Sequence, residues 1–205
     1  MRGVGIGDRD TAEPNQAVAA SVVDLGRRLH AARAGRFTVR QLAEAAQVSA
    51  GIISEVERGH GNPSFRTLYR ISQALGLRVG DLLDDPRRET AAGAASVVRA
   101  HQRKHLRLGS RALVYELLTP NLQGKLEMLL TRVSPGFSNE DEPFLHKGEE
   151  CVLLLEGSLE VMVGDSFHTL HEGDAITYDS GVSHWWRNPT DVEALIVGAV
   201  TPPSF

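Results

Sequence analysis

The sequence of 205 residues has little of several features that would place it in a specialised class. It has one cysteine, Cys151, so no disulfide can form within the chain, and we expect this residue to be a small buried hydrophobe in a reducing compartment. No stretch approaches the roughly 18 consecutive apolar residues of a membrane span. Residues 1–20 carry acidic and polar side chains where a signal peptide needs an apolar run. We therefore expect a cytoplasmic protein with no membrane partner.

Lysine is also scarce, and it is missing from residues 21–80, where nine arginines and four acidic residues give a net charge of +5. Residues 91–205 carry nine basic and fifteen acidic residues, a net charge of −6. The value of −4 for the whole chain hides this contrast. A basic first half and an acidic second half predict two domains with different partners, and nucleic acid fits the basic one.

The first half has the periodicity of helices. Apolar side chains recur at helical spacing between residues 22 and 83, which predicts four or five short helices packed into one bundle. Thr38 and Gln41 have the spacing of a capping box, and Ser49 is placed as an N-cap. Pro63 is placed as a first-turn proline.

The second half has the pattern of short strands. The apolar stripe stops after Leu83, and beyond it runs rich in Val, Leu and Ile alternate with turn residues, which predicts an antiparallel sandwich or barrel. These runs cover residues 112–118, 126–133, 152–155, 159–163, 175–178 and 194–200. We therefore expect an α+β protein with an all-α domain followed by an all-β domain. The predicted order is a flexible arm (1–20), a helical domain (21–83), a linker (84–96) and a β domain (97–205).

Residues 41–59 read Gln-Leu-Ala-Glu-Ala-Ala-Gln-Val-Ser followed by Ala-Gly-Ile-Ile-Ser-Glu-Val-Glu-Arg-Gly. This segment and its continuation through residues 62–76 resemble the helix-turn-helix of the Cro/repressor-type (XRE) family. Small Ala43 and Ala46 are expected to allow the two helices to approach closely. The residues expected to join the helices are Leu42, Ala45, Ile53 and Val56.

Burial of that apolar set leaves the outer face of the second helix free. In the family this face enters the major groove, so the resemblance implies a domain that binds a duplex DNA operator. Ser54 and Glu55 can address base edges, and Arg58 can reach a guanine or a phosphate. Gln41 is placed for a phosphate, and Gly51 allows close approach to DNA or is simply tolerated. The full candidate set is Thr38, Arg40, Gln41, Ser49, Ala50, Gly51, Ser54, Glu55 and Arg58. The alternative is a helix-turn-helix used only for packing or dimerisation.

Two further windows carry a second pattern of fixed spacing. Its residues are, in order, His146, Glu150, Gly157, Gly173, His184 and Asn188. The pattern resembles the two motifs of the cupin superfamily, whose fold is a double-stranded β-helix barrel. Two positions depart from it: Phe144 stands where the family has the first of two paired histidines, and Asp179 replaces a proline.

The alternation of side chains along a strand predicts which residues face the interior of this barrel. Glu150 and Val152 should face its interior from one strand, and His184 and Trp186 from another. Two imidazoles and one carboxylate suit non-haem Fe(II), or Zn or Mn, so the candidate metal ligands are His146, Glu150 and His184. The alternative is a metal-free pocket in which these residues bind an organic ligand. The predicted pocket consists of Phe144, His146, Glu150, Val152, Tyr178, His184 and Trp186.

A helix-turn-helix joined to a cupin barrel resembles a family of bacterial transcription regulators. The resemblance implies a protein without enzymatic activity that binds its operator as a homodimer and senses a small-molecule effector in the barrel. The alternative is a cupin metalloenzyme with an accessory helix-turn-helix, of the fosfomycin-type epoxidase or dioxygenase kind. We expect no further acid or base beside the candidate ligands, which favours the regulator.

Overall fold

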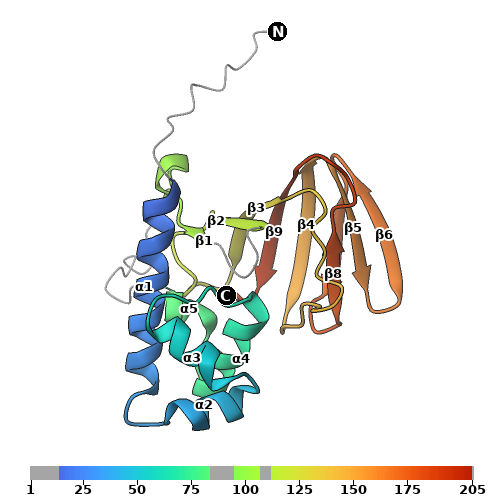
Figure 1. The fold of residues 1–205 in the computed structure, drawn as a ribbon. Coiled ribbons are helices and arrows are strands. Elements are labelled where there is room, and N and C mark those ends of the chain that lie inside the picture. The colour runs from blue at the N-terminus through green and yellow to red at the C-terminus, as the bar shows by residue number, and fades with distance from the viewer. Residues whose placement is uncertain (1–13, 84–94, 107–111, 205) are drawn as a thin grey trace.

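The computed structural model describes residues 14–83, 95–106 and 112–204, which form a helical domain and a β domain (Figure 1). The helices are α1 (Pro14–Arg33), α2 (Val39–Ala46), α3 (Ala50–Glu57), α4 (Phe65–Leu75) and α5 (Val79–Leu83). A 3-10 turn, η1 (Ala100–Gln102), precedes the strands β1 (His105–Leu106), β2 (Leu113–Leu117), β3 (Glu127–Val133), β4 (Glu149–Glu156), β5 (Ser158–Val163), β6 (Ser166–His171), β7 (Ala175–Asp179), β8 (His184–Arg187) and β9 (Ala194–Thr201). The predicted α+β fold is confirmed.

Side-chain caps fix where the central helices begin. The predicted capping box forms at α2: the backbone N–H of Gln41 donates to Thr38 Oγ1 (3.2 Å), and the N–H of Thr38 donates to Gln41 Oε1 (2.9 Å). Ser49 caps α3, as predicted. The prediction for Pro63 was wrong, because the hydroxyl of Ser64 accepts from the N–H of Thr67 and makes Ser64 the N-cap of α4.

The core of the helical domain joins α1, α2, α3 and α4. Leu42, Ile53 and Val56 are buried as predicted, but Ala45 is exposed. The short helix α2 turns the face that carries Leu42, Ala43 and Ala46 toward its neighbours, and Ala45 lies outside that face. The small alanines therefore supply the close approach between helices.

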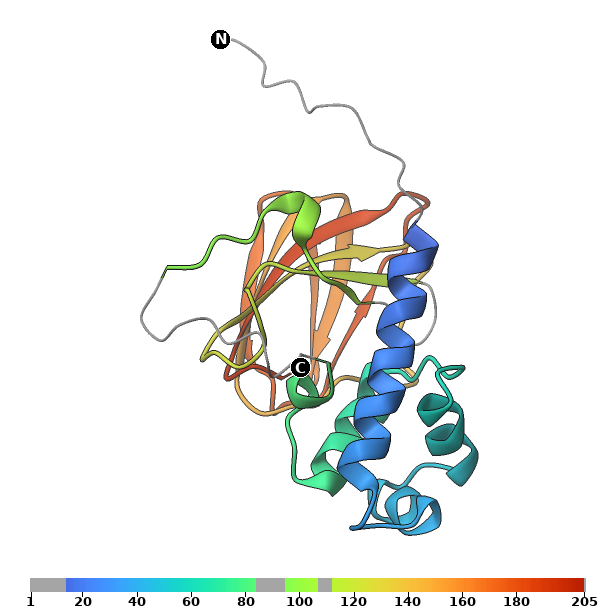
Figure 2. The same cartoon turned by 90° about the vertical axis from the view of Figure 1, so that its left-hand side faces the viewer.

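The β domain consists of two antiparallel sheets. One has six strands in the order β1-β2-β3-β9-β4-β7, and the other has three in the order β6-β5-β8. Buried residues alternate with partly exposed ones along β2, β3 and β9, so one face of each strand points into the barrel. In both views the helical domain lies at one end of this barrel (Figures 1 and 2).

Several details differ from the predictions. Pro14 to Ala20 are helical, where an arm was predicted, because the alanines here favour a helix and a proline is tolerated in its first turn. The rest of the arm and residues 84–94 of the predicted linker lie outside the described residues. Cys151 is exposed rather than buried, because Glu150 and Val152 face inward and its own side chain faces outward. Within the described ranges, no helix is long and apolar enough to cross a membrane.

Gly26 sets the distance between α1 and α3. A Cβ atom at this position would lie 2.4 Å from the carbonyl oxygen of Val56. We expect Gly26→Ala to lower the free energy of unfolding by about 1–3 kcal/mol in urea denaturation, since the backbones must separate. Gly51→Ala is the matched control: its Cβ would meet only Ser49 Oγ at 3.7 Å, so it should stabilise α3 by up to about 1 kcal/mol. Changes of the same sign at both glycines would contradict this account.

Candidate functional site

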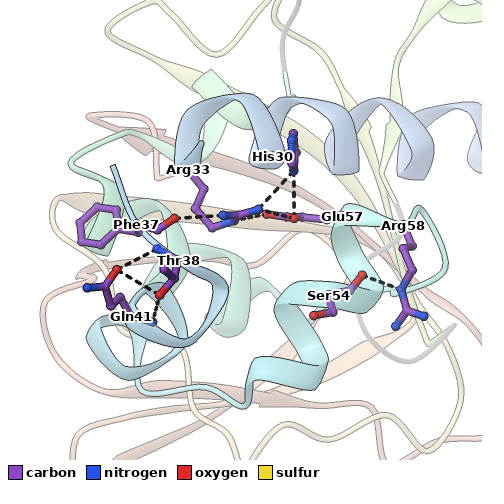
Figure 3. Close-up of polar contacts among 8 residues, drawn as sticks. All are labelled: His30, Arg33, Phe37, Thr38, Gln41, Ser54, Glu57 and Arg58. Atoms are coloured by element: carbon purple, nitrogen blue, oxygen red, sulfur yellow. Dashed lines mark hydrogen bonds and ion pairs between the residues drawn. The ribbon is translucent and has the colours of Figure 1, made fainter. Parts of the chain in front are cut away.

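The residues predicted to contact DNA lie on α2, on α3 and at their ends. All except Ser54, which is half-buried, are exposed. Arg58 follows the last residue of α3, where its Nε donates to the carbonyl oxygen of Ser54 (3.0 Å) and its terminal nitrogens point away from the helix (Figure 3). Exposed side chains of base-reading type therefore share the outer surface of the second helix.

The caps orient two of the polar candidates. Gln41 Oε1 accepts hydrogen bonds from both the N–H and the hydroxyl of Thr38 (2.9 and 3.0 Å; Figure 3), which holds the amide of Gln41 at the start of α2. A glutamine amide nitrogen in that place is a suitable donor to a phosphate. Ser49 uses its hydroxyl to accept from the N–H of Ile52 (3.2 Å), so its role in the structure is to cap α3.

An ion pair behind this surface ties α1 to α3. Arg33 Nε and Nη2 donate to the two carboxylate oxygens of Glu57 (2.5 and 2.8 Å), and His30 Nδ1 lies 3.1 Å from Glu57 Oε2 (Figure 3). Arg33 also donates to the carbonyl oxygen of Phe37, just before α2. The hydrogen bonds from Arg33 hold the pKa of Glu57 below its usual value. The sequence pattern did not reveal this pair, because its residues lie 24 positions apart.

We expect Glu57→Gln to lower the free energy of unfolding by about 1.5–3 kcal/mol at pH 7, because the bidentate charged hydrogen bonds are lost. The pKa of Glu57 is lower in the folded than in the unfolded chain, where it is about 4.3. The contribution is therefore complete above that pH and is lost as the pH falls through the folded-state pKa. Urea denaturation at pH 7 and in the acid range measures it, with exposed Glu55→Gln as the control. A deficit that is undiminished at the lowest pH would contradict the assignment.

In the barrel, three predicted residues converge. His146 precedes β4, Glu150 lies on β4, and His184 begins β8. Their imidazole Nε2 atoms lie 3.4 Å (His146) and 3.5 Å (His184) from the same oxygen, Glu150 Oε2. All three side chains are buried, and their potential ligand atoms lie within 4.8 Å of one another.

Hydrogen bonding fixes the tautomer of one histidine. His184 Nδ1 lies 2.9 Å from the carbonyl oxygen of Val182, which can only accept, so Nδ1 carries a proton and Nε2 faces Glu150. A neutral His184 would direct a lone pair at a carboxylate oxygen, so this pair needs a proton or a cation between its atoms. Burial opposes the ionisation of Glu150, but the two imidazoles outweigh it and hold its pKa below the usual value. His146 Nδ1 is buried and has no hydrogen-bond partner among the described residues.

The cluster fits a divalent metal ion. Two ligand atoms that each lie about 2.1 Å from one metal at angles of 90–109° are roughly 3.0–3.4 Å apart, close to the separations found here. Two imidazoles and a carboxylate are donors that Fe(II), Zn and Mn all accept. Phe144 offers no fourth ligand, and its ring packs against those of His184 and Trp186 instead.

The cavity beside the cluster is lined by four residues of the predicted pocket, namely Phe144, His146, Glu150 and Trp186. The other three residues of the predicted pocket, Val152, Tyr178 and His184, are not among the residues that line it. Val152 is fully buried in the barrel core, and Tyr178 stands behind Trp186, whose indole N–H donates to its hydroxyl (3.3 Å). His184 begins β8 of the three-stranded sheet and contacts Tyr178 of the six-stranded sheet, with ring centroids 4.9 Å apart.

Sequence reasoning missed the rest of the wall, which consists of Phe65, Tyr115, Glu127, Leu129, Thr131, Gly198, Val200 and Ser204. The alternation along β3 could have identified its three members, because they are the inward residues of that strand. The expectation of no further acid in the lining was wrong, since Glu127 lies there and accepts a hydrogen bond from the N–H of Ser204 (2.9 Å). Phe65 comes from α4, which strand parity cannot reveal.

These sites define a two-domain protein in which a helix-turn-helix domain is followed by a cupin domain. Residues 31–82 match the helix-turn-helix family and residues 129–199 the cupin domain family. The chain is 24% identical over 167 residues to the HTH-type transcriptional regulator PuuR of Escherichia coli (strain K12), which covers 81% of this chain and 88% of PuuR.

Two solved structures were compared with this fold. A helix-turn-helix family transcriptional regulator from Vibrio cholerae has a TM-score of 0.65 at 19% identity, covering 89% of this chain and 97% of that one. Hydroxypropylphosphonic acid epoxidase from S. wedmorenis has a TM-score of 0.46 at 20% identity, covering 90% of this chain and 100% of the enzyme. The first likeness shows the fold, and the second is too weak to support an argument about activity.

Proposed function

We propose that the protein is a transcriptional regulator, not an enzyme, that binds a duplex DNA operator in the cytoplasm and senses a small-molecule effector. Residues 21–83 bind the DNA, and residues 97–205 form the barrel that contains the effector cavity. The observation that carries this proposal is the outer surface of α3, where exposed Glu55 and Arg58 stand on a helix held in place by the Arg33–Glu57 pair. Similarity to PuuR, which is itself a transcriptional regulator, supports the same function.

The regulator acts as a homodimer, because one helix-turn-helix makes few base contacts and a second one, about 34 Å away, supplies the remaining specificity. The outer face of the six-stranded sheet supports this proposal. Cys151, Leu153 and Leu155 of β4 are exposed there, and Val197 of β9 pairs with Leu153 in the same sheet. A second copy of the chain would cover this apolar face.

We expect genomic fragments recovered with the purified protein to contain a palindromic or near-palindromic site. Arg58→Ala should weaken binding to that site by about 1–3 kcal/mol if the guanidinium reads a base, as fluorescence anisotropy would measure. Combined replacement of Gln41, Ser54 and Arg58 by Ala should abolish specific binding. Arg27→Ala, which removes an exposed charge from α1, is the control. Unchanged operator affinity in the triple variant would refute the proposal.

The His146, Glu150 and His184 cluster holds one divalent ion, of Fe, Zn or Mn. A bound ion would supply a positive charge and open coordination positions for oxygen or nitrogen atoms of the effector. The chain itself orients the ligands: the carbonyl of Val182 fixes the tautomer of His184, and the ring of Phe144 packs against the His184 imidazole.

Elemental analysis of purified protein reconstituted with Fe(II), Zn or Mn should find one ion per chain. His184→Gln should reduce this content at least about tenfold, because the loss of a ligand leaves only two. His171→Gln, an exposed histidine of β6, should leave it unchanged. If the wild-type protein takes up no stoichiometric metal, the metal proposal fails while the regulator proposal stands. Turnover of a substrate by the metal-loaded protein would favour the enzyme alternative.

A further inference from the structure

The cavity at the cluster is too small for an organic effector. Its volume is about 30 Å³, which is room for roughly two water molecules. Pockets that hold metabolites are typically about 300–1,000 Å³. An effector therefore enters this cavity only if part of its wall moves.

Phe65 is the part of the wall best placed to move. Its ring lies 6.0 Å from the ring of Phe144 and 6.0 Å from that of His146, edge-on to both, and it is 7% exposed. Most other wall residues lie on β3, β4, β8 and β9, which continuous ladders of backbone hydrogen bonds hold in register. Phe65 is the first residue of α4 in the helical domain, so a shift of that domain withdraws it without breaking a sheet.

A larger cleft lies on the other side of Phe65. Its volume is about 290 Å³, and Phe65 and Phe144 line both spaces, so the two rings form the partition between them. Two arginines of α4, Arg66 and Arg70, line the cleft together with Tyr69, and no described carboxylate does. Neither arginine forms an ion pair with a described residue. The cleft thus combines aromatic walls with two positive charges that no carboxylate in the described part of the chain neutralises.

We propose that the effector is an organic anion that occupies both spaces, takes the place of Phe65 and pairs its charge with Arg66 and Arg70. This inference rests on the proposed function and gives the effector its chemical class. It also explains how occupancy reaches the DNA-binding helices. Arg70 Nη1 donates a long hydrogen bond (3.5 Å) to the carbonyl oxygen of Gln47, in the turn between α2 and α3. An anion bound at Arg70 competes with this hydrogen bond to the α2–α3 turn. The same anion takes the place of Phe65 and so displaces α4 from the barrel.

The test uses 8-anilinonaphthalene-1-sulfonate, an aromatic anion whose fluorescence rises in apolar surroundings. We expect one probe to bind per full-length chain. Arg66→Gln combined with Arg70→Gln should weaken binding roughly tenfold, because two charged hydrogen bonds are lost at a partly exposed site. Arg27→Gln and Arg99→Gln together, which remove the same charge from exposed positions outside the cleft, should leave it unchanged. Equal affinity in the Arg66/Arg70 variant and the wild type would overturn the proposal.

Variants of Phe65 test whether its side chain must leave the cavity before the probe can bind. Phe65→Ala should tighten probe binding roughly tenfold, because the probe no longer displaces a buried ring. Phe65→Leu, which keeps an apolar anchor, should give an intermediate value and carries the test if thermal denaturation shows that Phe65→Ala is unfolded. Weaker probe binding in the folded variants would contradict the proposal that the ligand displaces Phe65.

A DNA titration separates this proposal from the proposed function. If the Arg66/Arg70 variant loses affinity for duplex DNA but keeps its affinity for the probe, the arginines serve phosphate binding and the effector proposal fails. If the wild-type protein binds no operator yet the probe results hold, the anion site stands and the regulator function fails.

Discussion

One aromatic contact joins the helical domain to the barrel: the ring of Phe65, on α4, packs against Phe144 and His146 at the mouth of the cavity. Gln123 supports it by donating from Nε2 to Asp81 Oδ1 (2.9 Å), which links the β2–β3 connection to α5. Because the contact is direct, communication between the domains does not depend on the segment that links them in sequence. A ligand can bind more tightly to one position of α4 than to another. The resulting change in operator affinity cannot exceed the ligand's difference in binding free energy between the two positions, commonly about 1–3 kcal/mol.

The buried carboxylate of Glu150 imposes a second constraint. An unpaired buried charge costs several kcal/mol, and the core of a β sandwich has no need of one. Two imidazoles converge on this carboxylate, and the carbonyl of Val182 fixes the orientation of one of them. The cluster therefore makes sense as a place for a cation, beside which an anionic effector is electrostatically favoured. Arg66 and Arg70, on the outer side of Phe65, favour an anionic effector for the same electrostatic reason.

Local patterns in the sequence predicted much of this architecture. Helical periodicity, the Thr38 capping box and strand parity located α2, α3 and β4, and the spacing of His146, Glu150 and His184 indicated one cluster. These signals act over a few residues or one strand. Phe65 was missed because its partners are about 80 positions away in another domain. Strand β6 was missed because five of its six side chains are exposed and leave no apolar run. Ala45 was misplaced because an eight-residue helix can turn either of two small-residue faces inward.

Hydrogen–deuterium exchange tests the central claim, that Phe65 on α4 couples the cavity to the DNA-facing helices α2 and α3. The full-length protein would be compared with and without saturating anilinonaphthalene sulfonate, following peptides that cover the first turn of α4 and the α2–α3 turn. If the ligand replaces Phe65, amides after Ser64 and around Gln47 should exchange faster while β4 and β8 become more protected. Protection confined to the barrel, with unchanged exchange in α4, would contradict the account.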